Sequence, residues 1–578
     1  MFLPTTQEEL RQLGWDRLDV VLVTGDSYID SPYVGISVIG KALVQAGFRV
    51  GIIAQPDRHS GEDIGRLGEP LLFWGITGGC IDSMVANYGP TGKKRKADDY
   101  TPGGVNNRRP DRAVIAYANL IRRYYNPTCP IVLGGIEASL RRVAHYDYWS
   151  NRIRRSLLFD ARADILAYGM AEKTVVTLAL RLQSKTNFRE IPGICYISDE
   201  IPAGYIEIPA FPIVAADKRT FIQMFSTFYH NNDPLSAKGL AQRQDTRFLI
   251  QTPPALPLTQ SELDAIHDLP YEHNHHPYYQ RQGAVTALDT IKFSILTHRG
   301  CYGECNFCAI AVHQGRRVQW RSEASILREA KRMVDHPDFK GYIQDVGGPT
   351  ANMFGFECNK KVHHGVCLDR RCLFPKICDQ LTVRHGSQIE LLRKIRAIKG
   401  IKKVFVRSGI RYDLILKDKR EGQNYLKEII FHHTSGQLKV APEHCQKNIL
   451  EHMGKHDAEN LLKFKKMFDE ISGLTGKKQF LTYYLIAAHP GCTLKDMMTL
   501  GTFCREKLHV SPEQVQIFTP TPSTYSTLMY WTEMDPNSFL PLFVEKNSRN
   551  KEKQKAAVVK KTTAITQYGK NKNNRLKS

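Results

Sequence analysis

The chain has 578 residues and carries 80 Lys and Arg against 58 Asp and Glu, a formal net charge of +22. A chain of this length is too long for one hydrophobic core, so we expect about three or four domains. It contains no run of about 18 apolar residues that could span a bilayer, and no signal-peptide pattern at its start. The composition therefore predicts no membrane span and a cytoplasmic location, where the 13 cysteines indicate metal sites rather than disulfides.

Residues 1–200 predict an α/β, doubly wound Rossmann-like domain. Residues 19–55 read as strand, loop, helix and strand, and further strand–helix units follow near 71–79, 130–139 and 163–182. Strands that alternate with helices indicate a parallel sheet covered by helices on both faces. Glycines stand at the ends of these strands, which also indicates a doubly wound sheet.

Two later segments have the composition of loops. Residues 89–112 are rich in Gly, Pro, Asn and basic side chains and predict a long loop, which either contacts an anionic substrate or is a solvated insertion. Residues 201–285 break the alternation and predict a connector, whose proline-rich part at 252–277 is expected to be extended with one short helix.

From residue 286 to residue 545 the alternation of strands and helices resumes. Six repeats of this kind predict a partial (β/α)6 barrel, whose active site lies at the carboxyl ends of its strands. Residues 546–578 are basic and poor in apolar side chains, and predict a disordered tail. The six strands are expected at 291–297, 341–346, 403–407, 436–440, 480–488 and 514–518.

Three cysteines follow the first of these strands in the order C-x3-C-x2-C, at Cys301, Cys305 and Cys308. Soft thiolates at this spacing select zinc, copper(I) or an iron–sulfur cluster. A four-iron electron carrier uses four cysteines, so three would leave one iron open to bind another molecule. The alternatives are a zinc loop completed by His313, and cysteines that are merely buried.

The motif resembles that of the radical S-adenosylmethionine (SAM) enzymes, in which an aromatic residue, here Phe307, precedes the last cysteine. The resemblance implies that the three cysteines bind a 4Fe-4S cluster and that the open iron chelates SAM. An electron donor such as flavodoxin or ferredoxin would then drive cleavage of SAM to a 5'-deoxyadenosyl radical, which abstracts hydrogen from an unidentified substrate. The cofactor carries this chemistry, and the protein supplies binding and orientation.

The resemblance narrows to the YgiQ-type radical SAM family, whose biochemical function is unassigned. It rests on the segments THRGCYGECNFCAIAVHQGR, DVGGPTANMFG, KKVFVRSGIRYDL, LKVAPEH and AAHPG. The family has a cobalamin-binding-like N-terminal domain, and the cobalt-ligating pattern D-x-H-x-x-G aligns with Asp30 to Gly35, where Pro32 replaces the histidine. The sequence thus argues against bound cobalamin, although radical SAM members can bind it without that ligand.

The resemblance also implies five cofactor-binding residues. Paired glycines let the backbone approach a ligand closely, and the family holds the SAM amino group at a Gly-Gly-Glu-like turn, whose acid is replaced here by proline. Two further residues end the third and fourth predicted strands at the barrel mouth, where ribose and carboxylate contacts are usual and ordinary salt bridges are the alternative. The five residues are Phe307, Gly347, Gly348, Arg411 and Glu443.

An expected insertion at 355–380 holds four more cysteines, spaced C-x8-C-x4-C-x5-C. Four thiolates in so short a segment suit structural zinc or an auxiliary iron–sulfur cluster, and unligated cysteines are the alternative. The spacing does not choose the metal. These cysteines are Cys358, Cys367, Cys372 and Cys378.

Three functions follow from these observations. The first is a radical SAM enzyme that abstracts hydrogen from an unidentified substrate. The second is a radical SAM enzyme that modifies RNA, such as a methylthiotransferase, which the positive charge and an auxiliary cluster favour. The third is a non-catalytic, metal-stabilised protein that binds nucleic acid, in which all seven clustered cysteines are structural.

Overall fold

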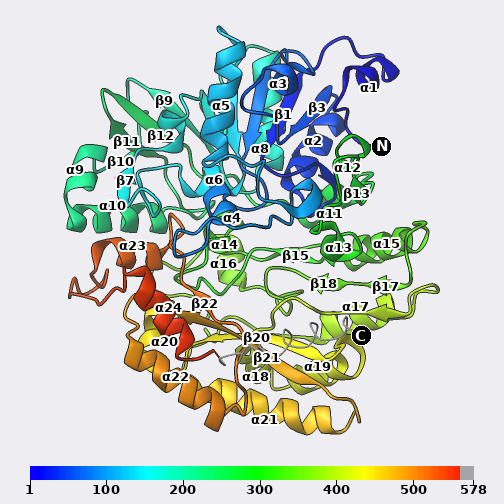
Figure 1. Ribbon diagram of the computed structural model, residues 1–578, viewed down its shortest axis with the longest axis vertical. Coiled ribbons are helices and arrows are strands. Elements are labelled where there is room, and N and C mark those ends of the chain that lie inside the picture. The colour runs from blue at the N-terminus through cyan, green and yellow to red at the C-terminus, as the bar shows by residue number, and fades with distance from the viewer. Residues whose placement is uncertain (560–578) are drawn as a thin grey trace, which may run out of the picture.

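A nine-stranded sheet organises the N-terminal half of the computed structural model, which describes residues 1–559 (Figure 1). The strand order is β10-β11-β12-β9-β8-β5-β4-β1-β3. Five neighbouring strands run parallel, which confirms the predicted α/β class with a large parallel sheet. They are β1 (Val20–Thr24), β3 (Val50–Ala54), β4 (Phe73–Thr77), β5 (Ile131–Gly134) and β8 (Ile165–Ala167).

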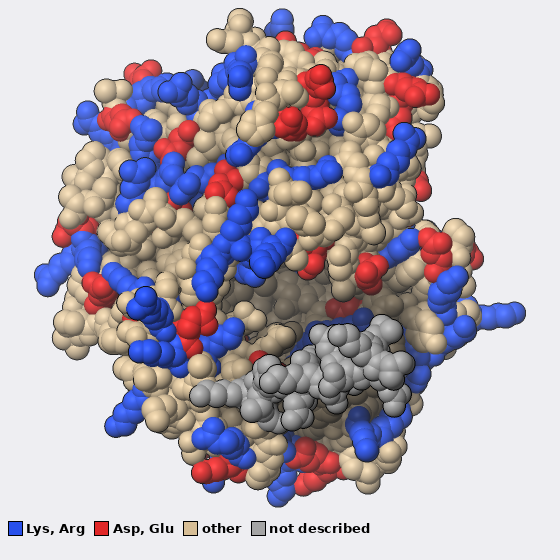
Figure 2. All heavy atoms as spheres, in the orientation of Figure 1, with Lys and Arg blue, Asp and Glu red and all other residues tan. Residues whose placement is uncertain are grey.

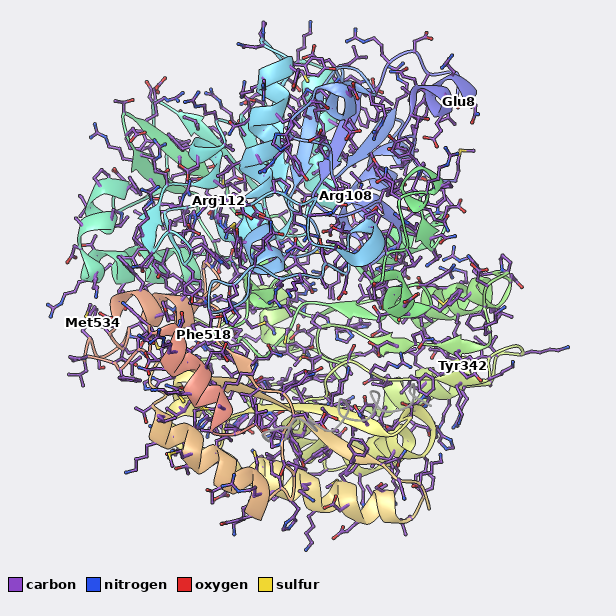
Figure 3. All side chains as sticks on the ribbon, viewed as in Figure 1. Glu8, Arg108, Arg112, Tyr342, Phe518 and Met534 are labelled. Carbon is purple, nitrogen blue, oxygen red and sulfur yellow. The ribbon has the colours of Figure 1, made fainter. Side chains whose placement is uncertain are left out.

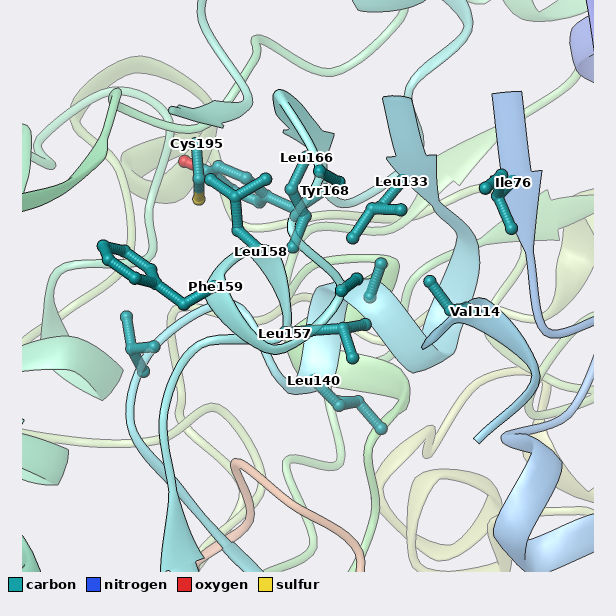
Figure 4. Close-up of a cluster of buried hydrophobic side chains, with 14 of the residues drawn as sticks. Ile76, Val114, Leu133, Leu140, Leu157, Leu158, Phe159, Leu166, Tyr168 and Cys195 are labelled. Carbon is teal, nitrogen blue, oxygen red and sulfur yellow. The ribbon is translucent and has the colours of Figure 1, made fainter. Parts of the chain in front are cut away.

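Both faces of this sheet are buried because alternate residues of each strand enter different cores. Val20 and Leu22 of β1 pack into a core under α2 (Gly35–Gln45) and α8 (Glu172–Gln183). Their neighbours Val21 and Val23 point to the opposite face, into a core that α5 (Ala113–Tyr124) and α6 (Gly135–Leu140) cover. A strand buried on both faces reads as a continuous apolar run, which is why VVLV was recognisable. Figure 4 shows the second core, where Leu133, Leu166 and Tyr168 meet Leu157 and Leu158.

The sheet extends past residue 200, where the sequence placed the end of the first domain. Strand β9 (Ile194–Ser198) runs antiparallel to β8, and three further strands continue the sheet from it. The expected connector therefore holds β10 (Ile206–Ile208), α9 (Phe211–Ala216), α10 (Lys218–His230), β11 (Leu240–Gln244), β12 (Arg247–Gln251) and α11 (Gln260–Asp268). The one short helix expected in residues 252–277 is α11. The strands before it were missed because β11 and β12 form a hairpin whose buried positions include glutamines that bond the backbone of residues 144 and 156.

Short parallel strands recur through the second half. They are β14 (Ser294–Leu296), β17 (Tyr342–Ile343), β18 (Asp345–Gly347), β19 (Lys403–Val404), β20 (Gln437–Glu443), β21 (Phe480–Ala487) and β22 (Gln516–Ile517). Strand β14 pairs with β18, β17 with β19, β20 with β21, and β21 with β22, while an isolated bridge joins Ile410 to Val440. Each of the six predicted strands overlaps at least one of these, and the prediction at 341–346 overlaps both β17 and β18.

Amphipathic helices lie between these strands and bury their apolar faces in one common core. Ile326, Leu392, Phe464 and Leu500 are examples of the buried residues. The larger helices are α15 (Glu323–Val334), α17 (Gly386–Arg396), α19 (Gly422–Glu428), α20 (Lys447–Met453), α21 (Glu459–Gly473) and α22 (Leu494–Glu506). Within the described part of the chain, none of the helices is both long and apolar enough to cross a membrane.

The sequence predicted a disordered tail from residue 546, but part of this segment forms a helix. Asn547 caps helix α24 (Ser548–Ala556) by accepting hydrogen bonds from the backbone of residues 549 and 550. Lys551 is 1% exposed and donates to the hydroxyls of Tyr148 and Tyr530, at 3.1 and 3.0 Å. The prediction failed because these tertiary contacts hold a helix whose own sequence is polar on every side. Residues 560–578 of the expected tail lie outside the described residues.

Candidate functional site

The three cysteines lie in a loop between β15 (His298–Arg299) and the short helix α14 (Ile310–His313). Gly303 lines the space between two of the sulfurs: a Cβ added there would lie 3.2 Å from Cys301 Sγ and 3.6 Å from Cys305 Sγ. Its backbone N–H donates to Cys301 Sγ at 3.3 Å. The backbone N–H of Cys308 donates to the carbonyl of Cys305 at 2.9 Å. The absence of a side chain at Gly303 therefore leaves room for a group held by both sulfurs.

Burial disfavours the thiolate forms of Cys301 and Cys308 when no metal is bound. Burial raises the pKa of Cys308 to about 12, with a smaller contribution from the nearby Cys305. Burial likewise raises the pKa of Cys301. A metal centre would displace these protons, because thiolate is the form that binds metal. The donor set of three soft sulfurs fits an iron–sulfur cluster.

Arg411 lies beside the cysteine loop and carries a charge that the site keeps fixed. Its Nη1 donates to Cys305 Sγ at 3.7 Å, and its Nε donates to Asp413 Oδ1 at 2.9 Å. Burial opposes the charged form, but the Asp413 carboxylate and the cysteine sulfurs outweigh it and raise the pKa of Arg411. Asn352 orients this residue by accepting from its backbone N–H at 2.9 Å and donating to its carbonyl at 3.0 Å.

The predicted glycine turn after β18 meets the same loop. Thr350 brings its hydroxyl to 3.7 Å from Cys301 Sγ. The carbonyl of Gly347 accepts from the backbone of Thr297 at 2.7 Å, so this oxygen is already engaged. A glycine is required at position 348 because the His298 ring lies close to its backbone: an added Cβ would be 2.6 Å from Nε2 of His298. The turn thus has a protein neighbour at each glycine, and ligand contacts from its backbone stay a prediction.

Glu443 ends β20 with φ +67°, a conformation that a non-glycine residue adopts only where its surroundings hold it. Its carboxylate pairs with Lys455 at 3.2 Å and is 7% exposed. Its charge contributes, less than burial and the neighbouring cysteines, to the raised pKa of Cys308. Of the two predicted polar residues, Arg411 contacts the cysteine loop, and both Arg411 and Glu443 take part in the salt bridges that were the alternative.

Phe307 packs at the junction of the two halves. It contacts the core of the N-terminal sheet and the core of the second half alike. Its ring meets that of His489 edge-on, with centroids 6.5 Å apart. The aromatic residue before the third cysteine therefore helps to close the loop against solvent.

Comparison with known proteins now adds to this geometry. A family model described as "Radical SAM N-terminal" matches residues 2–294. A UPF0313 protein of Fusobacterium nucleatum is 56% identical over 97% of this chain and 99% of its own length. Those of Methanocella arvoryzae and Thermotoga petrophila are 48% and 45% identical, over 94% and 97% of this chain and 90% and 98% of their own lengths. The chain belongs to the UPF0313 radical SAM family.

Two solved structures resemble this UPF0313 protein at much lower sequence identity. The methyltransferase TsrM from Kitasatospora setae, with cobalamin and a [4Fe-4S] cluster bound, gives a TM-score of 0.49 at 15% identity over 88% of this chain and 73% of that one. OxsB, a cobalamin-dependent radical enzyme, gives 0.48 at 12% identity over 91% and 57%. The cobalamin and the cluster named for these two enzymes are ligands of those enzymes.

Sequence reasoning missed the residues that anchor the cysteine loop of the UPF0313 protein. Arg371 donates to the carbonyl of Glu304 at 3.1 Å and to Asn306 Oδ1 at 2.6 Å. The backbone N–H of Asn306 donates to the carbonyl of Met453 at 2.9 Å. Tyr302 is fully buried against the insertion that supplies Arg371. Only Tyr302, adjacent to a cysteine, had any signal in the sequence, because the other contacts arise from distant segments.

The four cysteines of the insertion lie in different surroundings. Cys358 is 7% exposed and belongs to an apolar cluster with Tyr302 and Phe356. The other three are partly buried, and Cys372 Sγ accepts from Lys361 Nζ at 3.5 Å. Among residues 1–559, the loop of Cys301, Cys305 and Cys308 included, no three His, Cys, Asp or Glu side chains are arranged to hold a metal ion. Both metal centres therefore stay predictions.

Pro32, the residue in place of the cobalt-ligating histidine, lines a cavity of about 420 Å³ at the edge of the N-terminal sheet. Asp30, two residues earlier, is fully buried and pairs with Lys41 at 3.0 Å. The aspartate is thus committed to a lysine. The prediction that cobalamin is not bound here is neither confirmed nor contradicted.

Proposed function

We propose that this UPF0313 protein is a radical SAM enzyme in which Cys301, Cys305 and Cys308 hold a 4Fe-4S cluster. When bound, the cluster would supply the electron that cleaves SAM, after reduction by a donor such as flavodoxin or ferredoxin. The observation that carries the proposal is the space at Gly303, which is flanked by two cysteine sulfurs beside the permanently charged Arg411. The protein's own part is to bind, orient and keep water away.

The six parallel strands of the second half are proposed to form the partial (β/α)6 barrel. Their pairing in chain order supports this, as does the place of the cysteine loop and the glycine turn after β14 and β18. Carboxyl ends of barrel strands are where active sites lie. In this layout the nine-stranded sheet is the Rossmann-like domain, now extended to residue 251, and residues 252–285 connect the two.

The neighbouring residues are proposed to bind SAM. The backbone of Gly347 and Gly348 would meet its amino group, and Glu443 and Arg411 its polar groups. Arg411 also offsets part of the negative charge that three thiolates bring. Phe307, packed between the cores, would exclude water from the radical.

The test is reductive cleavage of SAM. Anaerobically reconstituted protein with dithionite should convert SAM to 5'-deoxyadenosine and should contain iron and sulfide. Cys301→Ala should abolish both properties, whereas Cys129→Ala, a matched change at a partly buried cysteine outside the loop, should leave them intact. Undiminished cleavage in the triple alanine variant of Cys301, Cys305 and Cys308 would overturn the proposal, as would material that contains only zinc.

RNA modification is a second candidate, favoured by the loop predicted at 89–112. Its basic residues Lys93, Lys94, Arg95, Lys96 and Arg108 are all exposed. Lys and Arg side chains gather on the face in Figure 2 above its central hollow, and Arg108 and Arg112 lie there in Figure 3. Exposed clusters of this kind attract phosphate backbones.

Binding of bulk transfer RNA should separate this candidate from the first. Phosphate contacts make affinity fall with salt, by a slope of roughly one per contact. The quadruple alanine variant of Lys93 to Lys96 should bind more weakly and show a shallower slope. Absence of RNA binding even at low salt would count against RNA as substrate, and binding without SAM cleavage would favour a non-catalytic nucleic-acid-binding protein.

A further inference from the structure

A cavity of about 420 Å³ lies between the carboxyl edge of the N-terminal sheet and the segment that carries the cysteines. One wall includes the last residue of each of four parallel strands: Thr24, Thr77, Gly134 and Ala167. The opposite wall comes from the second half, with Leu296, Arg299, Ile310 and His313. Its volume lies within the range of small-molecule sites, about 300–1,000 Å³. Because α14 directly follows the last cysteine, a molecule in this cavity would lie next to the cysteine loop.

Two buried charged side chains in the cavity wall have unused hydrogen-bonding atoms. Glu172 and Arg299 are each 3% exposed, and they pair through one carboxylate oxygen and Nη1. The other oxygen of Glu172 and the Nε–H of Arg299 have no hydrogen-bond partner in the described residues 1–559, and both atoms are buried, so a ligand in the cavity would reach them by turning these two side chains. A buried polar atom without a partner costs free energy, so a ligand that offered it one would gain that energy back.

We propose that this cavity is the substrate pocket, and that it takes a compact, uncharged molecule with an apolar body and a paired donor–acceptor edge, such as an amide, lactam or heterocyclic base. The donor of such an edge would meet Glu172 Oε2 and its acceptor would meet the Nε–H of Arg299. Because the two protein charges already balance each other, a charged ligand would leave one charge uncompensated. The assignment to substrate, rather than to another ligand, rests on the proposed function.

The cavity can be filled at a single position without backbone strain. Gly134 has φ −154° and ψ −175°, an extended conformation that any residue can adopt, and a Cβ there would meet only the carbonyl of Ala167, at 3.9 Å. Gly134→Leu would therefore project into the cavity. Gly473→Leu is the matched control, because Gly473 is exposed and has nothing within 4 Å of its added Cβ.

The experiment is a titration of the reconstituted full-length protein, without SAM or reductant, with 2-naphthamide and 2-naphthoate. Naphthamide has the apolar body and the amide edge, and naphthoate differs from it by its charge. Naphthamide should bind about tenfold more tightly or better, and Gly134→Leu should abolish that binding while Gly473→Leu leaves it unchanged. In Glu172→Gln the unpaired Arg299 should reverse the preference toward naphthoate, a change that loss of structure alone would not produce.

Equal affinity for the two naphthalene probes, or naphthamide binding that survives Gly134→Leu, would overturn the proposal. So would displacement of naphthamide by aquacobalamin, which would assign the cavity to that cofactor. The outcome is distinct from that of the SAM test. Protein that binds naphthamide but forms no 5'-deoxyadenosine refutes the radical chemistry alone, and protein that forms 5'-deoxyadenosine without binding naphthamide refutes the pocket alone.

Discussion

At the scale of single residues, the cysteine loop depends on the lack of a side chain at Gly303 as well as on its three sulfurs. Gly303 leaves space that a side chain would take from Cys301 and Cys305. The three cysteines themselves were predictable, because their spacing is a local pattern. Their supports were not, since Arg371 and Asn352 reach the site only through the folded chain.

Gly303→Val should prevent the loop from accommodating a cluster. The added branches would lie against two sulfurs that a Cβ alone approaches at 3.2 and 3.6 Å. We expect iron content and 5'-deoxyadenosine formation to fall on the order of tenfold, the low end of losses seen when the surroundings of a metal site change. Gly436→Val, at a partly exposed glycine with open space around it, should retain both. Full iron content in Gly303→Val would show that the loop accommodates a cluster even with a side chain at this position.

Arg411→Met should destabilise the apoprotein by about 3 kcal/mol, because it leaves the Asp413 carboxylate buried without its main partner. Asp413 is 4% exposed, and the guanidinium holds its pKa below the usual range against the effect of burial. Denaturant unfolding at pH 7 would measure the loss. The double variant Arg411→Met with Asp413→Leu should recover most of it, and equal stability of Arg411→Met and wild type would show that the pair contributes little.

At the scale of elements, the local sequence pattern predicted the buried parallel strands well, and it missed elements with polar sequences. Each of the six strands expected after residue 290 overlaps an observed strand, because buried parallel strands read as short apolar runs between helices. The hairpin of β11 and β12 escaped notice because its strands carry polar side chains that are satisfied by distant backbone groups. Helix α24 escaped for the same reason.

The pH dependence of stability should reveal how α24 is docked. Burial lowers the pKa of Lys551 to about 8, whereas its ordinary value is 10.5. Between these two values the unfolded chain holds a proton that the folded protein has released, so this residue's contribution to stability rises with pH. Relative to Lys551→Met, wild type should gain on the order of 2 kcal/mol between pH 8 and pH 10.5. Thermal unfolding at both values would test this, with the exposed Lys553→Met as control.

At the scale of the whole molecule, the two halves share their interior. The core beneath the N-terminal sheet includes Val312, Phe518, Leu528 and Tyr530 from the second half. Phe518 lies at this junction in Figure 3 and meets the rings of His489 and Tyr530. The sequence predicted two domains from two runs of strand–helix units, and could not predict this sharing, because it follows from tertiary contacts.

A shared interior predicts cooperative unfolding. Calorimetry of the apoprotein should give one transition rather than two, and Phe518→Ala should shift that whole transition to lower temperature, since removal of a buried phenylalanine costs about 3–5 kcal/mol. Phe480→Ala, at a side chain that is 53% exposed, should shift it little. Two separate transitions in the wild type would show that the halves unfold independently.

Helix α24 has a consequence for the order in which the protein can be made. Gln554 accepts from the backbone N–H of Ala488 at 2.9 Å and donates to the carbonyl of Cys492 at 3.1 Å, in the turn that follows β21. That turn cannot gain its last two hydrogen bonds until synthesis has passed residue 554. On the ribosome the nascent second half is therefore incomplete until residue 554 has emerged.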